Sequence, residues 1–168
     1  MQLATHRTQS VDRLFPYLDT AENLPMRIKH LTCLATLSLT FLATEASADI
    51  LIRRNGSSWA RVDDDGTIRI KGRSVGSFES NGTVRRGGSS IGTIESNGTI
   101  RRQGSSVGRV HTDGTIRRRG SSIGRIESGG SIRRNGSSWG SASSCCGSFG
   151  GKKAVTAVLV FFADDFFD

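Results

Sequence analysis

A sixteen-residue unit repeats along the middle of the chain and constrains its fold more than any other feature. Each copy opens on an apolar residue, and the copies start at Ile52, Ile68, Val84, Ile100, Ile116 and, for a partial sixth copy, Ile132. A unit this short buries an apolar face only against its neighbours. The sequence therefore predicts a repeat architecture that five full units and one partial unit build together.

Two turn signals divide each unit into two short strands. The first is a pair ending in glycine, such as Gln103-Gly104, where a two-residue hairpin requires positive φ. It predicts that Ile100 pairs with Val107. The second is Ser96-Asn97-Gly98 or a variant, a three-residue loop that pairs Ile94 with Ile100. Both turns set apolar residues opposite each other, which predicts an antiparallel meander with one buried face.

A glycine in the second strand predicts a regular bend. Val107 and Val110 lie three residues apart, so a regular strand would point them to opposite faces, but a bulge at Gly108 turns both inward. The same bend in every unit favours closure of five units around one circuit; an open β-solenoid is the alternative. Trp59 and Trp139 hold equivalent positions five units apart, so closure would bring both to one seam. Otherwise they are two unrelated core residues.

The unit "IRR-x-GSS-I-G-x-I-ESNGT" resembles the repeat of the bacterial five-fold β-flower proteins, whose short hairpins surround a central axis. The resemblance covers residues 50–168 and includes the tail "KKAVTAVLVFFADDFFD". The arginine pairs and the "SSCCGSFGG" insert depart from that family. The resemblance implies an all-β fold with the tail packed at the axis or at one end. That family is defined by its shape, so no activity follows.

Residues 26–48 have the layout of a secretory signal peptide. Basic residues follow Met26, an apolar run too short to span a membrane comes next, and Ala46-Ser47-Ala48 fits a cleavage site. We therefore expect an exported protein, periplasmic, cell-surface or secreted, that starts at Asp49, with residues 1–25 an upstream extension that is not native. A true N-terminal segment followed by an apolar core helix is the alternative.

Composition divides the expected mature chain into three parts. These are a β-repeat domain over residues 49–141, a Gly/Ser/Cys linker over 142–153 and an apolar tail over 154–168. The tail is too short to cross a bilayer, and its pattern fits a helix or a strand. We expect it to cover the inner face of the meander. Self-association or attachment to a membrane surface is the alternative, since exposed apolar segments associate.

Cys145 and Cys146 are the cysteines that follow the signal segment. An exported protein can oxidise them, so we expect a disulfide, either between these neighbours or to another chain. The alternative is two small loop residues. Two cysteines without a third ligand make a poor zinc site, and we expect no metal or cofactor.

Arginine dominates the net charge of +8. Strand alternation places the first arginine of each pair opposite the apolar face, which predicts an outer band of guanidinium groups. The band comprises Arg53, Arg85, Arg101, Arg117 and Arg133, with Arg61, Arg109 and Arg125 as cross-strand neighbours. Guanidinium groups bind carboxylates or phosphates through two parallel hydrogen bonds. Anionic polysaccharide and lipid head groups are the expected partners; solubility and protection of strand edges are the alternative role.

The second arginine of each pair shares the parity of the apolar residues. We expect its stem to lie across the glycine gap of the next strand and its head group to reach solvent. This set comprises Arg54, Arg86, Arg102, Arg118 and Arg134.

Catalytic motifs do not emerge from the sequence. His111 occupies the place of Glu79, Glu95 and Glu127 in other units, so we interpret it as a polar residue beside a turn, and the serines belong to turns. We expect a non-enzymatic structural or binding module. A nucleic-acid-binding protein is the alternative, disfavoured by the export signal and by the scarcity of aromatic residues in the repeats.

Overall fold

The computed structural model describes residues 48–168, so the expected upstream extension (1–25) and signal peptide (26–48) lie outside the described part, apart from Ala48. Twelve strands and one helix make up this part. They are β1 (Ile50–Arg54), β2 (Ser57–Val62), β3 (Thr67–Ile70), β4 (Arg73–Phe78), β5 (Thr83–Arg86), β6 (Ser89–Ile94), β7 (Thr99–Arg102), β8 (Ser105–Val110), β9 (Thr115–Arg118), β10 (Ser121–Ile126), β11 (Ser131–Arg134), β12 (Ser137–Ser143) and α1 (Phe149–Phe161).

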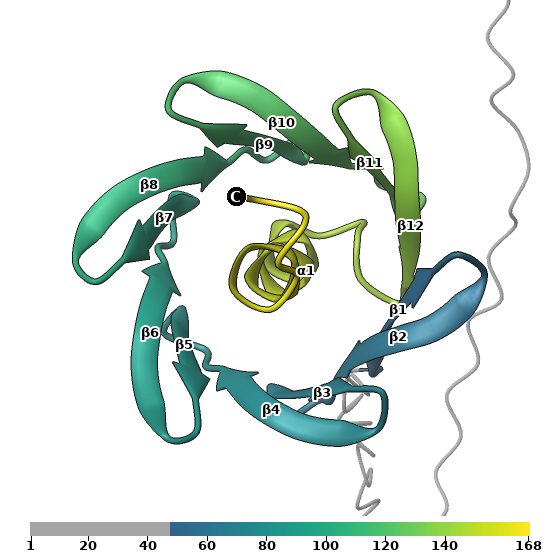
Figure 1. Cartoon of the computed structure of the whole chain (residues 1–168), viewed down its shortest axis with the longest axis horizontal. Coiled ribbons are helices and arrows are strands. Elements are labelled where there is room, and N and C mark those ends of the chain that lie inside the picture. Colours follow the sequence, from purple (N-terminus) through teal and green to yellow (C-terminus); the bar gives the residue numbers. More distant parts are fainter. Residues whose placement is uncertain (1–47) are drawn as a thin grey trace, which may run out of the picture. The chain divides into compact units, whose positions relative to one another are not determined.

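Each strand pairs antiparallel with its neighbours in the chain, and β1 pairs with β12 to close a barrel of six hairpins around a central axis (Figure 1). The all-β hairpin meander is confirmed. The five-unit circuit is wrong, and so is the open solenoid. The partial copy at Ile132 already holds both strands of a hairpin, β11 and β12, and β12 supplies the edge that β1 needs.

The contact between the two tryptophans where the barrel closes is confirmed, although the circuit holds six hairpins and not five units. Trp59 on β2 and Trp139 on β12 pack edge to face, with ring centroids 5.4 Å apart. A separation of five units puts them in the first and sixth hairpins. These hairpins are neighbours because the ring closes between them.

Both turn types form as the sequence predicts. Gln103 and Gly104 have φ of 48° and 79°, so both residues of the two-residue loop are left-handed. In the three-residue loop, Gly98 has φ of 87° and Glu95 donates its backbone N–H to the Thr99 carbonyl at 2.9 Å. Ile94 pairs with Ile100 as predicted.

A β-bulge interrupts the register within each of the six hairpins. The predicted pairing of Ile100 with Val107 is wrong, because Ile100 lies opposite Gly108 and Arg101 lies opposite Ser106. Val107 is the extra residue on the bulged strand. The bulge itself was predicted; the shift of one residue that it causes in the pairing was not.

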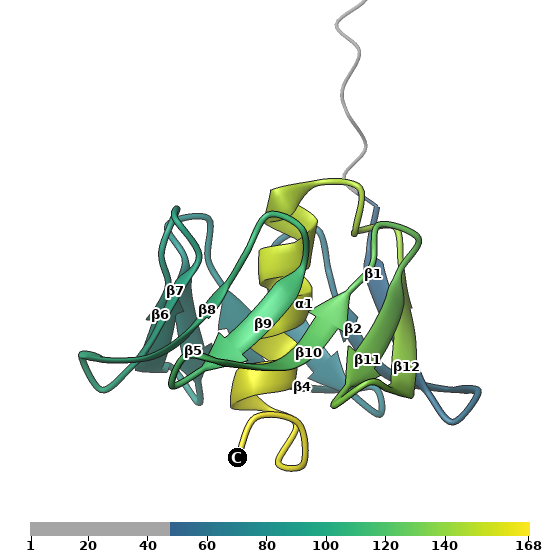
Figure 2. The ribbon, with the colours of Figure 1, turned by 90° about the horizontal axis from the view of Figure 1, so that it is seen from above.

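Helix α1 lies along the barrel axis (Figures 1 and 2), which confirms the expected place of the tail. The helix begins at Phe149, inside the expected linker (142–153), and ends at Phe161, so only the first half of the expected tail (154–168) is helical. Ser148 caps the helix by accepting a hydrogen bond from the Gly151 N–H at 3.0 Å. Inward side chains of the strands, such as Ile68 and Ile100, are fully buried around α1. A helix that is apolar on all sides needs such an enclosure. Among residues 48–168, no helix has the length and apolar character that a membrane crossing requires.

Candidate anion-binding surface

The first arginine of each pair projects outward, and two of the three predicted cross-strand neighbours, Arg109 and Arg125, lie opposite one. Arg61 faces Arg69 instead, because Arg53 lies opposite Ser58 and Ser141. Arg109 lies opposite Arg117, and Arg125 lies opposite Arg133. Arg85 and Arg101 face Ser77 and Thr93 instead. The outer band thus has places where two arginines meet and places where one stands alone.

A carboxylate at the start of the three-residue turn pairs with three of the five first arginines and with Arg69, which holds the same place in the second unit. The pairs are Asp63 with Arg69 at 2.8 Å, Glu79 with Arg85 at 2.5 Å, Glu95 with Arg101 at 2.6 Å and Glu127 with Arg133 at 2.9 Å. From the sequence, Glu79, Glu95 and Glu127 are interpreted only as polar residues beside turns. The constant spacing of six residues between each acid and its arginine is the signal in the sequence that indicates these pairs.

Two first arginines depart from this rule within residues 48–168. Arg117 has His111 in the place of the turn carboxylate. Arg53 lies where the barrel closes, and Ser143, which pairs with Leu51, takes that place beside it. The Arg117 guanidinium donates to the Gly120 carbonyl at 3.2 Å and makes no ion pair with a described residue. Arg109, opposite Arg117, likewise hydrogen-bonds a carbonyl, that of Asn97, at 3.2 Å.

Asp63 shows what this geometry does when a carboxylate is present. Arg61 and Arg69 face each other across β2 and β3, and Asp63 accepts the Arg61 Nε–H at 2.5 Å and the Arg69 Nε–H at 2.8 Å. The hydrogen bond from Arg69, with that from Arg61, holds the pKa of Asp63 below its ordinary value. Two facing arginines on this barrel therefore bind a single carboxylate between them.

The second arginines (Arg54, Arg86, Arg102, Arg118 and Arg134) form an inner collar around the C-terminal end of α1, which the repeat pattern does not predict. Their side chains do reach solvent in part, since Arg86 is exposed and the Arg102 side chain is 30% exposed. Their head groups are bound as well: Arg86 donates to the Phe161 carbonyl, Arg102 to the Val160 carbonyl and Arg134 to the Phe166 carbonyl. These carbonyls include acceptors that a helix end leaves without a partner, and the negative end of the helix dipole favours cations there.

Carboxylates and aromatic rings of the tail complete the collar. Arg54 pairs with Asp165, and Arg102 pairs with Asp168 at 3.0 Å. The Arg86 guanidinium lies 4.8 Å from the centroid of the Phe162 ring, within the range of a cation–π contact. The collar arginines are therefore occupied by the fold itself.

Glycines opposite the collar arginines give the tail rings their room. A Cβ on Gly76 would lie 2.8 Å from Phe162 Cζ, and a Cβ on Gly124 would lie 2.8 Å from Phe166 Cζ. The glycine gap predicted from the sequence is thus filled by phenylalanine, and the arginine heads stack against these rings.

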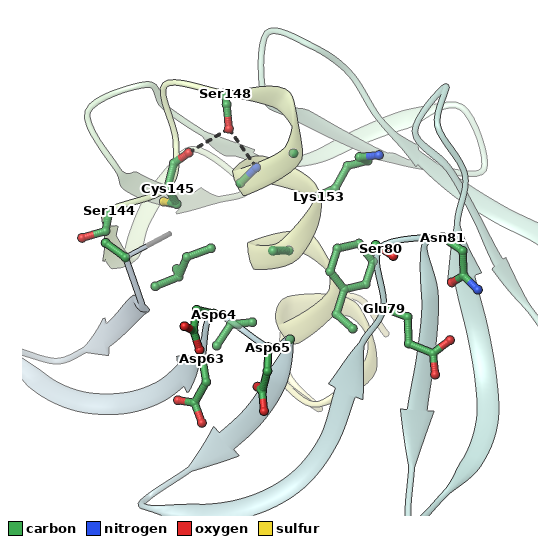
Figure 3. Close-up of a pocket in the computed structure, with 18 residues that line it drawn as sticks. Asp63, Asp64, Asp65, Glu79, Ser80, Asn81, Ser144, Cys145, Ser148 and Lys153 are labelled. Carbon is green, nitrogen blue, oxygen red and sulfur yellow. Dashed lines mark hydrogen bonds between the residues drawn. The ribbon is translucent and has the colours of Figure 1, made fainter. Parts of the chain in front are cut away.

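A hollow opens beside the N-terminal end of α1 (Figure 3). It has a volume of about 820 Å³, and its lining includes Asp63, Asp65, Glu79 and Lys153. Much of this acidic lining is engaged, since Asp63 and Glu79 bind arginines and Asp65 accepts the Thr67 N–H at 2.8 Å. Within residues 48–168, no group of three or more potential metal ligands gathers.

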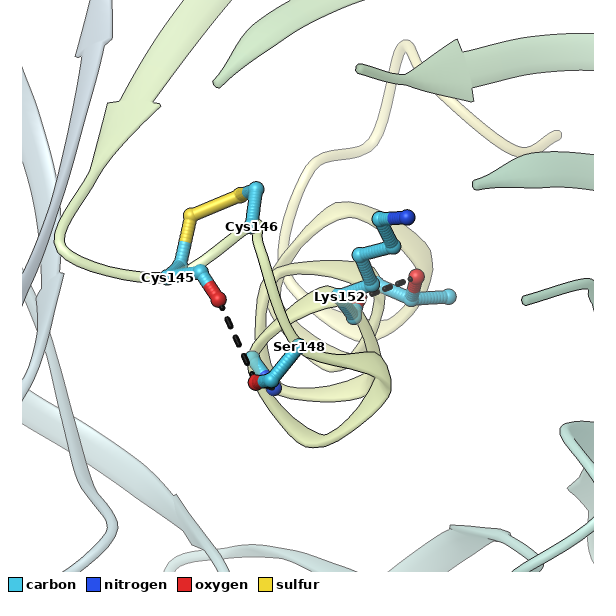
Figure 4. The surroundings of a disulfide bond; sticks show 6 residues. Cys145, Cys146, Ser148 and Lys152 are labelled. Atoms are coloured by element: carbon cyan, nitrogen blue, oxygen red, sulfur yellow. Dashed lines mark hydrogen bonds between the residues drawn. A yellow bond between two sulfur atoms is a disulfide. The ribbon is translucent and has the colours of Figure 1, made fainter. Parts of the chain in front are cut away.

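Cys145 and Cys146 form a disulfide with each other in the link between β12 and α1 (Figure 4), which selects one of the pairings that the sequence left open. The Cys145 carbonyl accepts a hydrogen bond from the Ser148 hydroxyl at 3.4 Å. A few residues later, buried Lys152 donates through Nζ to the Thr112 carbonyl at 2.8 Å. The start of the helix is thereby fastened to the turn that carries His111.

Comparisons of the chain with protein-family models, with curated proteins and with solved structures find no match.

Proposed function

We propose that the chain is a non-enzymatic, exported structural or binding module that engages anionic envelope polymers through its outer arginines. The observation that supports this most is the division of the arginines into three groups. The collar arginines are bound by the tail, most outer arginines are bound by turn carboxylates, and Arg109 and Arg117 face each other with no described carboxylate between them.

Closure of the barrel weakens the alternative role of the charge. Charged side chains on short strands protect exposed sheet edges from pairing with other chains. Every one of the twelve strands pairs on both sides, so the barrel presents no such edge. Protection of strand edges therefore does not explain the outer arginines.

The aromatic residues favour a polysaccharide or lipid head group over nucleic acid. Proteins that bind single strands stack bases on exposed aromatic rings. The described tryptophan and phenylalanine side chains lie in the core or pack against it instead. We also propose that the chain is a six-hairpin relative of the β-flower proteins, on the strength of the repeat pattern.

Binding of the full chain to immobilised polymers tests the proposal. Polygalacturonate, anionic lipid vesicles, single-stranded DNA and neutral dextran are compared at low salt and at about 150 mM salt, where exposed charges are screened beyond about 8 Å. We expect saturable, salt-sensitive binding to polygalacturonate or vesicles. Arg109→Gln with Arg117→Gln should weaken it more than Arg85→Gln with Arg101→Gln, because the second pair is already neutralised by Glu79 and Glu95.

Three results would contradict the proposal. They are the absence of binding at either salt, preference for DNA, or equal loss in the two double variants. Export is tested separately by N-terminal sequencing of the protein from the medium or periplasm, which we expect to begin at Asp49.

A further inference from the structure

We propose that Arg109 and Arg117, with His111 in the turn between β8 and β9, form a discrete site for one carboxylate of a uronic acid unit. This inference rests on the proposed function and narrows it to one place and one chemical group. It follows from a comparison of the hairpins with one another, since the repeat places equivalent residues at equivalent positions around the ring.

The turn between β2 and β3 shows the occupied form of this arrangement. Asp63 bridges Arg61 and Arg69, and its side chain is only 12% exposed. At the equivalent position between Arg109 and Arg117 the chain has His111, which carries no negative charge in either protonation state. The two arginines thus lie opposite each other in the register that holds a carboxylate elsewhere, and neither forms an ion pair with a described carboxylate.

Asp113, the acidic residue of the turn that carries His111, binds other partners. Asp113 accepts the backbone N–H of Thr115 at 2.9 Å and its hydroxyl at 2.8 Å, and these hydrogen bonds hold the pKa of Asp113 below its ordinary value. Its charged neighbour is Arg125, at 3.8 Å. Asp113 forms no ion pair with Arg117.

A hollow at this place has room for more than the carboxylate. It measures about 300 Å³ and is lined by Arg109, Arg117, Arg119, His111 and Ser106, among others. Three guanidinium groups supply the charge, while the Ser106 hydroxyl and the His111 imidazole can hydrogen-bond sugar hydroxyls. A uronic acid unit presents a carboxylate and hydroxyl groups together, so it matches both parts of the lining.

The site is held in shape before any ligand arrives. Lys152 of the axial helix donates to the Thr112 carbonyl at 2.8 Å, which fixes the turn carrying His111 from the inside. Arg109 and Arg117 are anchored by the Asn97 and Gly120 carbonyls. Such preorganisation lowers the entropy lost when a ligand is bound.

Calorimetric titration of the full chain with trigalacturonate tests the site, with neutral galactotriose and triglutamate as comparison probes. We expect one trigalacturonate per chain and no binding of galactotriose. His111→Glu copies the residue of the other turns and fills the place of the ligand, so we expect it to lower the affinity at least about tenfold while the chain stays folded. Arg117→Gln should do the same by removing one guanidinium.

Two further variants act as matched controls. Glu95→His makes the same exchange in the turn between β6 and β7, where Arg101 faces Thr93, so we expect it to leave the affinity within about twofold. Asp63→His frees the Arg61–Arg69 pair, and we expect it to raise the stoichiometry from one site to two. Thermal unfolding of each variant checks that the fold is intact.

The outcomes separate this inference from the proposed function. Trigalacturonate binding that His111→Glu leaves unchanged would overturn the site, even if the polymer still bound the band. So would polymer binding without any binding of the trisaccharide, or tighter binding of triglutamate, which would point to an acidic peptide. If neither the polymer nor the trisaccharide binds, both proposals fall.

Discussion

Replacing Arg102 by glutamine should destabilise the protein far more than the same change at its neighbour Arg101. The two side chains point to opposite faces of β7. Arg102 lies in the inner collar and donates to the Val160 carbonyl, pairs with Asp168 and stacks on two phenylalanine rings. Arg101 lies outside, is 42% exposed and pairs with Glu95.

The magnitudes follow from these contacts. A hydrogen bond from a charged donor to a partly buried carbonyl contributes about 1.5–3 kcal/mol, each cation–π contact about 0.5–1 and the exposed pair with Asp168 at most about 1. Ordering a long side chain offsets part of this, and a glutamine keeps some packing. We therefore expect Arg102→Gln to lower the free energy of unfolding by about 2–4 kcal/mol. Arg101→Gln should lower it by less than about 1 kcal/mol.

Guanidinium chloride denaturation of the full chain, followed by tryptophan fluorescence and far-UV circular dichroism, measures both variants. The m-value should stay constant, so that the midpoint reports stability. Repeating the comparison in urea at low and high sodium chloride isolates the contact with the carbonyl, since added salt screens the exposed ion pairs but not the partly buried hydrogen bond. Equal losses in the two variants, or a loss below about 0.5 kcal/mol for Arg102→Gln, would refute the role of the collar.

Three further outcomes follow from the geometry of the barrel. Gly124→Ala should cost about 1–3 kcal/mol, because its Cβ would lie 2.7 Å from the Arg133 carbonyl oxygen and 2.8 Å from Phe166 Cζ, whereas Gly129→Ala, with open space around it, should be nearly neutral; similar unfolding midpoints would contradict this. The pKa of Asp63 is lowered from 3.8 in the folded state, so its contribution to stability is present above that pH and is lost as the pH falls below it. Acid titrations should therefore show a shallower loss of stability for Asp63→Asn than for the native protein, and parallel curves would count against it. The disulfide joins adjacent residues Cys145 and Cys146 and constrains little of the unfolded chain, so the double serine variant should unfold within about 1 kcal/mol of the native protein; a larger loss in denaturant titrations would show that it secures the axial helix.

Local features of the repeat could be predicted because each depends on residues close together in the chain. Positive φ at Gly104, the bulge near Gly108 and the pairing of Ile94 with Ile100 all follow from turn chemistry and strand parity. The number of hairpins does not follow from the unit length. It depends on the accumulated bend, and on the fact that the partial copy after Ile132 holds two complete strands.

The inner collar could not be predicted because its contacts have no period. Arg54 binds Asp165 across 111 residues, and Arg86 binds the Phe161 carbonyl across 75. A strand pattern says that such a side chain has the parity of the core, and a charged residue with that parity is ordinarily expected to extend to solvent. The tail gives these head groups partners as well, since a helix end placed at the axis supplies carbonyl and carboxylate acceptors that no repeat contains.

Residues that differ from the repeat consensus indicate function best, because the consensus residues account for the barrel itself. In the second unit, Ile70 stands in the place of a collar arginine and packs against the apolar core, so that exchange serves the fold. His111 does the opposite: it leaves Arg109 and Arg117 facing each other without the carboxylate that Asp63 provides to the equivalent pair in the first unit. Like charges directly opposite each other on a sheet are destabilising. An arrangement that costs the isolated chain stability, at a place where one glutamate would relieve it, is better explained by an external anion than by folding.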